Sequence, residues 1–177
     1  GINDFFYLEP LTEKVKHTAV KEPVAIYKAT KKGIAEKIKV KNRRNWICEI
    51  ESEYLKRVIN SPKQTESISI DEENLPNMIF ICNKSKPELR KSGHFGALNY
   101  IEWGEKQRTD DEDNRLWPDV PSVSGRHYWW SIKEEGEYDF ILPQFYDKTF
   151  IVPEIKNKAV ATNNFFVISS LENQILK

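Results

Sequence analysis

The strongest constraint on the fold is a series of four apolar, strand-like runs in the last third of the chain. These runs are HYWWSI, DFILPQF, FIVPEI and NNFFVIS, and turn-forming residues separate them at Glu135-Gly136, Tyr146-Asp147 and Asn157. Short apolar runs bounded by such residues are typical of β-strands. Pro143 and Pro153 lie inside two of the runs, and because proline cannot donate to a strand ladder, they indicate edge positions or bulges. The C-terminal part is therefore predicted to form a β-sheet.

The preceding part of the chain mixes strands with short helices. Further strands are predicted after the turn in GINDFFYL, over VAIYKA (residues 24–29), over WICEI, over ISI and in the apolar run that ends near Cys82. Short helices are predicted over ESEYLKRVI (residues 51–59) and on both sides of Ser92-Gly93, whereas KKGIAEKIKVKNRRN is expected to be a short helix or an exposed loop. The fold class is therefore α+β: a β-rich scaffold of mixed or antiparallel sheet with a few short helices and long loops.

Length and apolar runs bound the organisation of the chain and its location. Its 177 residues fit one domain with a substantial core, with a subdivision expected into residues 1–115 and 116–177. The first residue is glycine, and we expect the sequence to be a fragment of a longer protein. No apolar run approaches the length of a membrane span, and the start lacks a signal-peptide pattern. Cys48 and Cys82 lie in apolar runs, which indicates buried thiols in a cytoplasmic protein.

The formal net charge of zero hides an uneven distribution of charge. Residues 13–44 contain eleven lysines and arginines against three acids, a net charge of +8, so the remainder of the chain carries −8. Such a split argues against a protein that coats nucleic acid indiscriminately. It allows one basic face to meet phosphates while the rest of the surface repels them. A basic stretch that simply stays in water is the alternative.

Familiar catalytic motifs are missing from the sequence. It contains no glycine-rich phosphate loop, no GxSxG, no HExxH and no CxxC pair. The histidines His17, His94 and His127 are far apart and show no partner spacing, and the acidic run TDDEDN is expected to be a solvated loop. One enzymatic alternative is a nuclease of the PD-(D/E)xK type, in which Asp147 and Glu154 would hold a divalent metal and Lys156 would position water.

Several pieces, taken in order, resemble the target recognition domain of adenine-specific DNA methyltransferases, found in Taq-like enzymes and in fused type IIG restriction–modification proteins. GINDFFYL is similar to the glycine-asparagine-aromatic entry of these domains, ESEYLKRVINSPKQ to a following segment, and LNYIEWGEKQ to a helix ending in a Gly-Glu pair. GRHYWWSI resembles an arginine followed by a Trp/Tyr pair, and ILPQF, IVPEI and NNFFVIS resemble the proline-marked final strands. The resemblance spans residue 1 to about residue 170.

The resemblance implies a module that recognises a double-stranded DNA sequence and positions an upstream methyltransferase domain of the same polypeptide. The Asn/Asp-Pro-Pro-Tyr/Phe loop that holds the flipped adenine is absent, as is a glycine motif for S-adenosyl-L-methionine. This chain is therefore expected to hold no cofactor and to methylate nothing alone, whereas S-adenosyl-L-methionine would bind the missing catalytic domain. The parent protein is expected to be an adenine-specific DNA methyltransferase, which in the fused class also carries a restriction endonuclease.

In such a module, lysines and backbone amides hold phosphates, arginine reads guanine, and asparagine or glutamine reads adenine. The candidate DNA contacts lie in loops and beside turns. They are Lys41, Arg43, Arg44, Lys63, Gln64, Lys84, Lys86, Arg90, Lys91, Arg108, Arg115, Arg126 and His127. For each of them, a solvated side chain without a ligand is the alternative.

The aromatic stretch GRHYWW (residues 125–130) is expected to belong mainly to the core. If residues 128–132 form a strand, Trp129 and Trp130 point to opposite faces, as in a strand buried between layers. Arg126 and His127, at the start of that strand, remain candidate DNA contacts. The alternative is a carbohydrate- or protein-binding β module that exposes the tryptophans.

Overall fold

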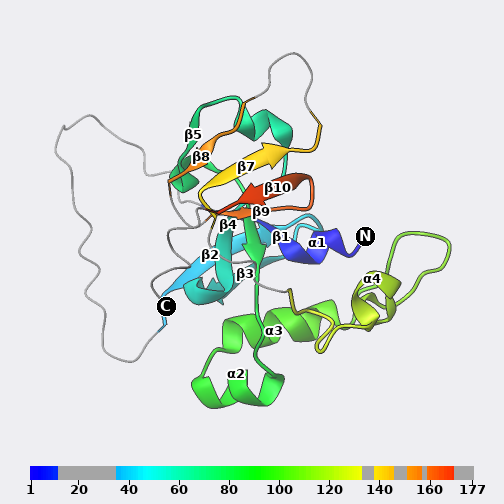
Figure 1. Cartoon of the computed structure of the whole chain (residues 1–177). Coiled ribbons are helices and arrows are strands. Elements are labelled where there is room, and N and C mark those ends of the chain that lie inside the picture. Colours follow the sequence, from blue (N-terminus) through cyan, green and yellow to red (C-terminus); the bar gives the residue numbers. More distant parts are fainter. Residues whose placement is uncertain (12–34, 133–137, 146–150, 157–158, 170–177) are drawn as a thin grey trace.

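The computed structural model describes residues 1–11, 35–132, 138–145, 151–156 and 159–169 (Figure 1). The strand predicted over residues 24–29 lies outside the described residues, as do the predicted turns at 135–136, 146–147 and 157 and the acid Asp147. Among the described residues, no helix is long and apolar enough to cross a membrane.

Six strands form the first sheet, in the order β3-β2-β1-β6-β4-β9. A short helix, α1 (Asn3–Phe6), leads into the first strand. The strands are β1 (Tyr7–Pro10), β2 (Lys37–Asn42), β3 (Ile47–Glu51), β4 (Leu55–Ile59), β6 (Met78–Phe80) and β9 (Val160–Ala161). All neighbours pair antiparallel except β4 and β9, which run parallel. The strands expected after GINDFF, over WICEI and before Cys82 are confirmed.

Four strands form the second sheet, in the order β10-β7-β8-β5. They are β5 (Ser69–Ile70), β7 (Phe140–Pro143), β8 (Glu154–Ile155) and β10 (Phe165–Ile168). Three of the four C-terminal runs that predicted strands therefore form them. β7 and β8 are inner strands of this sheet, so the edge positions predicted from the prolines are wrong. Pro143 is the last residue of β7 and Pro153 directly precedes the two-residue β8, so both prolines stand where a strand ends or begins.

The longer helices lie in sequence between β6 and the C-terminal strands. They are α2 (Lys86–Ser92) and α3 (Phe95–Gly104), and a single turn, α4 (Pro121–Ser124), comes later. Ser85 and Glu88 form a reciprocal capping box at the start of α2. Gly93, with a φ of 73°, ends α2 in the left-handed conformation that glycine adopts without strain. The break predicted at Ser92-Gly93 and the α+β class are thus confirmed.

Two predictions in the first half of the chain are wrong. Residues 51–59 are not a helix: a 3₁₀ turn (Ser52–Tyr54) is followed by β4, which β6 and β9 flank on either side and supply with backbone partners. The basic segment is neither helix nor loop at residues 37–42, where β2 forms. Lysines at 37, 39 and 41 alternate there with Ile38, Val40 and Asn42, which is the period of two that a strand requires.

For the aromatic stretch at residues 126–130, the predicted burial of Trp129 and Trp130 is confirmed and the predicted strand is wrong. The backbone of this stretch forms turns rather than a strand, with the Ser131 N–H donating to the Tyr128 carbonyl. The Arg126 guanidinium donates to the Ser131 carbonyl and closes the same loop. Trp129 and Trp130 are only 8% and 5% exposed, and their rings meet edge to face with centroids 6.0 Å apart. They belong to the core, as expected, and offer no exposed binding surface.

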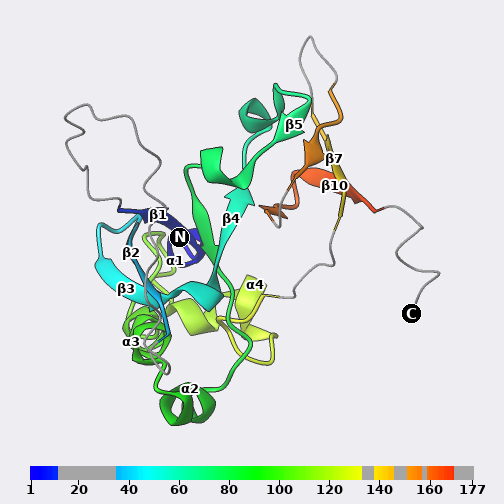
Figure 2. The same cartoon turned by 90° about the vertical axis from the view of Figure 1, so that its left-hand side faces the viewer.

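Buried side chains form two hydrophobic clusters that are interleaved in sequence. The first contains residues from Phe5 to Trp130 and is centred on aromatic rings: Phe5 stacks on Tyr100 and contacts the rings of Trp117 and Trp129. The second lies on the smaller sheet and contains Ile59, Ile70, Leu75, Ile141, Ile155, Ala159, Ala161 and Phe165. Figure 2 shows β4 running from the first sheet toward the second.

One buried carboxylate joins the first sheet to α3. Glu51, at the end of β3, is fully buried and accepts hydrogen bonds from the backbone N–H groups of Gly96 (2.9 Å) and Ala97 (2.8 Å). The Lys37 ammonium lies 3.5 Å from the same carboxylate. Burial alone would raise the pKa of Glu51, but the two N–H donors and the Lys37 charge hold it below the ordinary value. Glu51 therefore satisfies the first turn of α3 as an ionised group.

Replacing Glu51 by glutamine should destabilise the protein by about 2 kcal/mol at neutral pH, because an amide cannot accept both N–H groups. Since folding lowers this pKa, the contribution is present above the unfolded value near 4.5 and is lost as pH falls through the folded value. In urea unfolding, the gap between the wild type and Glu51→Gln should stay constant down to about pH 5 and then shrink. The exposed Glu66→Gln variant is the control, and a gap that persists in acid contradicts the assignment.

The close approach of α3 to β3 requires glycine at position 96. A Cβ atom there would lie against the Glu49 carbonyl oxygen and 2.9 Å from Glu51 Oε2. Gly96→Ala should therefore lower the free energy of unfolding by about 3 kcal/mol. Gly125→Ala, where a Cβ meets nothing within 4 Å, should change it by less than about 0.5 kcal/mol. Equal urea midpoints for the two variants would show that α3 does not need this approach.

Candidate nucleic-acid interface

The hairpin between β2 and β3 is held in one conformation by Asn42. The Asn42 N–H donates to the Trp46 carbonyl, and its side-chain oxygen accepts from the backbone N–H groups of Arg44 (2.9 Å) and Trp46 (3.0 Å). Asn45 takes a positive φ of 61°, which asparagine tolerates better than most residues. The sequence NRRNW thus forms a tight, fixed tip.

The two adjacent arginines of this tip have opposite environments. Arg44 points inward: its guanidinium donates to the Arg108 carbonyl (2.9 Å), pairs with Asp110 (2.5 Å) and lies 5.2 Å from the centre of the Trp117 ring. Arg43 is exposed, and its guanidinium lies 5.6 Å from the centre of the Tyr7 ring. The fixed backbone therefore holds Arg44 half-buried against Trp117 and presents Arg43 to solvent.

Arg43 is one of the residues that line a polar hollow of about 340 Å³. Its lining comes from β1, from the hairpin and from the segment before β6: Tyr7, Leu8, Glu9, Lys41, Asn42, Arg43, Asn45 and Asn77. The Lys41 ammonium lies 3.7 Å from the Glu9 carboxylate. Burial raises the pKa of the Tyr7 phenol, which the nearby Arg43 charge only partly offsets, so Tyr7 is neutral at physiological pH. The hollow thus presents two cations and one carboxylate together with the Tyr7 phenol and the amides of Asn45 and Asn77.

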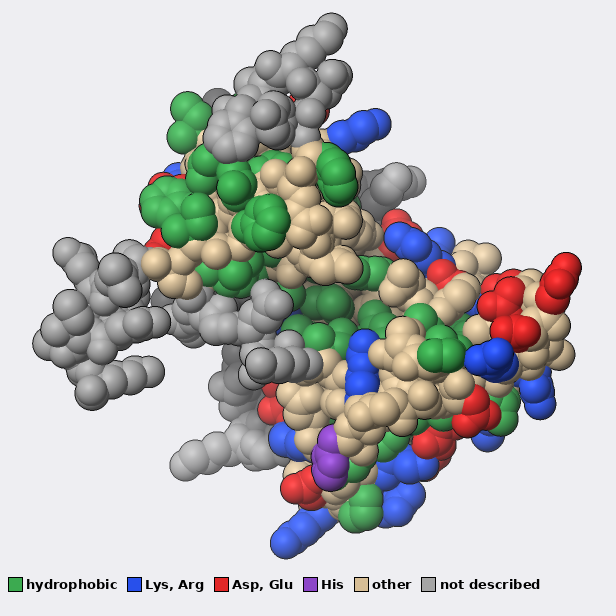
Figure 3. All heavy atoms as spheres, turned by 45° about the vertical axis from the view of Figure 1, so that its right-hand side comes forward, with side chains coloured by type: hydrophobic (Ala, Val, Ile, Leu, Met, Phe, Trp, Pro, Cys, Tyr) green, Lys and Arg blue, Asp and Glu red, His purple; other side chains and the backbone are tan. Residues whose placement is uncertain are grey.

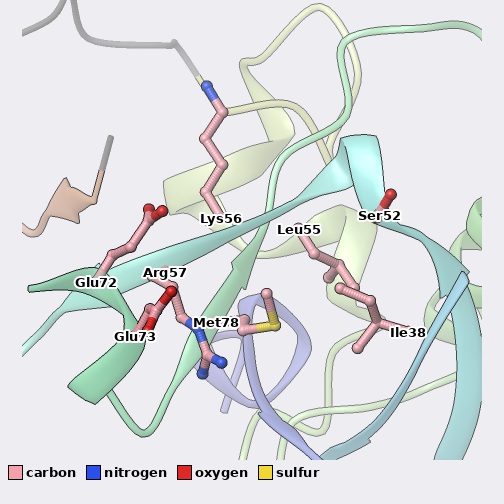
Figure 4. Close-up of a pocket in the computed structure, with 8 residues that line it drawn as sticks. All are labelled: Ile38, Ser52, Leu55, Lys56, Arg57, Glu72, Glu73 and Met78. Carbon is pink, nitrogen blue, oxygen red and sulfur yellow. The ribbon is translucent and has the colours of Figure 1, made fainter. Parts of the chain in front are cut away.

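A second hollow, of about 370 Å³, has a different character (Figure 4). Ile38, Leu55 and Met78 line it with apolar atoms. Two cations, Lys56 and Arg57, and two acids, Glu72 and Glu73, complete the lining with Ser52. Because the opposite charges balance, this hollow has no net attraction for a phosphate.

Half of the candidate lysines and arginines outside the hairpin pair with carboxylates. Around α2, Lys84 pairs with Glu53 (3.0 Å), Lys86 with Glu105 (2.8 Å) and Arg90 with Glu102 (3.6 Å), whereas Lys91 is exposed on the same helix. The Glu53 carboxylate is shared with His94, which also contacts the Tyr54 hydroxyl at 2.6 Å. Each such pair reduces the field that these cations present to a polyanion.

The remaining candidates lie in turns. Gln64 caps the 3₁₀ turn Pro62–Thr65, accepting from the N–H groups of Asn60 and Ser61, while Lys63 in that turn is exposed. Arg108 donates to the Asn114 carbonyl, and Arg115 pairs with Asp113 at 2.9 Å. Arg126 lies 5.3 Å from the Phe6 ring centre, and the exposed His127 contacts the Tyr128 ring.

These placements do not gather all the candidates on one surface. The contact between Arg44 and the Arg108 carbonyl brings the hairpin beside the 108–116 loop. By contrast, α2 and β5, which follows the turn with Lys63, lie at opposite ends of the molecule (Figure 1). Figure 3 shows cations and acids interspersed over the lower part and hydrophobic side chains gathered over the second sheet, where Phe140, Phe166 and Ile168 are exposed. Among these surfaces, the hairpin tip is the best candidate site for binding a polyanion.

Structural support for catalysis is slight within the described residues. No group of three or more His, Cys, Asp or Glu side chains among them could hold a metal ion. Glu154 on β8 and Lys156 just after it are exposed, and Asp147 lies outside the described residues, so the nuclease alternative stays a hypothesis. Burial raises the pKa of Cys48 to about 12 and that of Cys82 to about 11, so both thiols remain protonated.

Six of the eight residues that line the hollow were absent from the sequence-based candidates: Tyr7, Leu8, Glu9, Asn42, Asn45 and Asn77. Asn45 had a usable signal, because asparagine between two strand-like runs is typical of a hairpin tip. Tyr7 and Asn77 carried none, since only the pairing of β1 with β2 and β6 brings them beside Arg43.

Comparisons with protein-family models, with curated proteins and with solved structures found no match to this chain. The geometry of the hairpin and its hollow therefore carries the functional argument.

The unequal environments of the two arginines predict unequal effects on stability. Arg44→Ala should cost about 1–2 kcal/mol, because it removes packing on Trp117 and a hydrogen bond to the Arg108 carbonyl. Arg43→Ala should change stability by less than about 0.5 kcal/mol, since the side chain is exposed. Urea midpoints of the two variants test this directly. A larger loss for Arg43→Ala would mean that the tip is oriented the other way.

Proposed function

We propose that this chain binds double-stranded DNA through the tip of the β2–β3 hairpin and serves as the recognition module of an adenine-specific DNA methyltransferase or fused restriction–modification enzyme. The observation that carries the proposal is the outward display of Arg43 and Asn45 on a tip that Asn42 and Arg44 hold rigid. Arginine and asparagine are side chains that read base edges by paired hydrogen bonds. A rigid support reduces the entropy lost when such side chains bind.

The shape of the tip also suits a duplex. β2 pairs with β1 as far as Asn42, so the turn at residues 43–46 is the part of the hairpin that extends past the paired strands and would approach the major groove, which is about 12 Å wide. Lys41 and Asn77, set back from the tip in the hollow, supply donors of the kind that hold a phosphate beside the groove. Base reading at the tip and phosphate contact behind it are the two kinds of contact that a sequence-specific module needs.

The charge arrangement sets the expected strength of binding. On β2, Lys37 lies 3.5 Å from Glu51 and Lys41 lies 3.7 Å from Glu9, so these two lysines are partly neutralised by neighbouring strands. The isolated chain should therefore bind DNA weakly and locally, rather than along a broad cationic face. In the longer protein, the upstream methyltransferase domain would add contacts and hold S-adenosyl-L-methionine.

Duplex binding by the chain should be sensitive to salt and centred on the hairpin. Fluorescence anisotropy with a labelled random-sequence duplex should show binding at micromolar protein in low salt that weakens steeply between about 50 and 200 mM salt. Lys41→Ala should lower the affinity and reduce the slope of log affinity against log salt by about 0.9, as expected for one phosphate contact.

Lys63→Ala is the matched control, because Lys63 is an exposed lysine in a turn remote from the hairpin. Its affinity and salt slope should equal those of the wild type. If no duplex binds in low salt, the proposed function is wrong; if Lys63→Ala weakens binding as much as Lys41→Ala, the hairpin is not the site.

A further inference from the structure

We infer that Arg43 is a specificity-determining residue that reads a guanine in the major groove. This inference rests on the proposed function and concerns the base that the site selects. Arginine donates two parallel hydrogen bonds to O6 and N7 of guanine, which no other base edge accepts in the same geometry. The question is whether the structure prepares Arg43 for a base or for a phosphate.

The Tyr7 ring supports the Arg43 guanidinium from one side. The Arg43 guanidinium carbon lies 5.6 Å from the centre of the Tyr7 ring, close enough for a cation–π contact. Tyr7 is itself fixed in β1, which pairs with β6 through Tyr7 and Ile79. An aromatic face against one side of a guanidinium restricts its plane and leaves its N–H edge for a ligand. Such preorganisation favours a planar, bidentate acceptor.

Arg43 differs from its neighbouring cations in its distance from carboxylates. Within the described part of the chain, no carboxylate lies within 4.0 Å of Arg43, whereas Arg44 pairs with Asp110 and Lys41 with Glu9. Of the three cations at this hairpin that the sequence predicted as DNA contacts, Arg43 is therefore the one not held by an acid. Its donors are available to a base.

Arg43 and Lys41 differ in their position along the hairpin. Arg43 follows the end of β2 and stands at the tip, whereas Lys41 lies two residues back on the strand and is half-buried. Lys41 is paired with Glu9 of β1 inside the sheet, whereas Arg43 lies in the turn beyond the paired strands, so a groove approached by this turn meets Arg43 first and leaves Lys41 nearer the backbone. The phosphate role therefore falls to Lys41.

The test uses the whole 177-residue chain and duplexes selected from a randomised library. Selected sequences should share a guanine whose replacement by 7-deazaguanine, which lacks the N7 acceptor, weakens wild-type binding about tenfold. Arg43→Ala should bind the two duplexes equally, with no preference at that position. Arg43→Lys, which keeps the charge and loses the planar fork, should recover non-specific affinity without recovering the preference.

The other outcomes of this experiment separate a failure of the Arg43 inference from a failure of the proposed function. If Arg43→Ala weakens binding to all duplexes alike and lowers the salt slope by about 0.9, Arg43 contacts a phosphate and the inference is overturned, while the proposed function stands. If selection yields no shared guanine, or 7-deazaguanine has no effect, the inference is likewise wrong. Absence of any duplex binding in low salt overturns the proposed function itself.

Discussion

The packing of α3 against the first sheet depends on the ionised carboxylate of Glu51. Glu51 ends β3, lies in the interior and accepts the N–H groups of Gly96 and Ala97 at the start of α3. A buried charge is costly unless it is fully hydrogen-bonded, so this arrangement fixes both the direction of α3 and its distance from the sheet. The glycine at position 96 follows from it, because the backbone of the helix has to reach the carboxylate.

From α3 the constraint extends to the hairpin. Tyr100 in α3 donates its hydroxyl hydrogen to the Phe5 carbonyl at 2.6 Å, and its ring lies between those of Phe5 and Trp46. The Asn42 amide reaches the same hydroxyl at 3.5 Å, while its oxygen holds the hairpin backbone. A chain of contacts thus runs from the centre of the core to the tip. The side chains proposed to touch DNA stand on the same packing that stabilises the fold.

Sequence patterns located most elements, and their failures have a common cause. The helix break at Ser92-Gly93 and the strands β7 and β10 follow from local chemistry: caps, turns and short apolar runs. Residues 51–59 and the basic segment failed because strand pairing outweighs local helical preference: β4 pairs with β6 and β9, and β2 pairs with β1 as well as with the adjacent β3. The candidate site divides in the same way. Type and spacing pointed to both arginines of the hairpin, but only the contacts with Trp117 and Tyr7 distinguish Arg44 from Arg43.

The strand β4 has a consequence for how the molecule can be divided. Leu55 and Val58 of this strand belong to the large aromatic cluster, and Ile59 at its end belongs to the cluster of the smaller sheet. β9 returns from the far end of the chain to pair with this same strand. Deleting the C-terminal segment would therefore expose backbone and apolar surface in the middle of the remaining protein. Among the described residues, β4 contributes to the hydrophobic clusters of both sheets. A displacement of the smaller sheet would therefore be transmitted through β4 to the larger sheet.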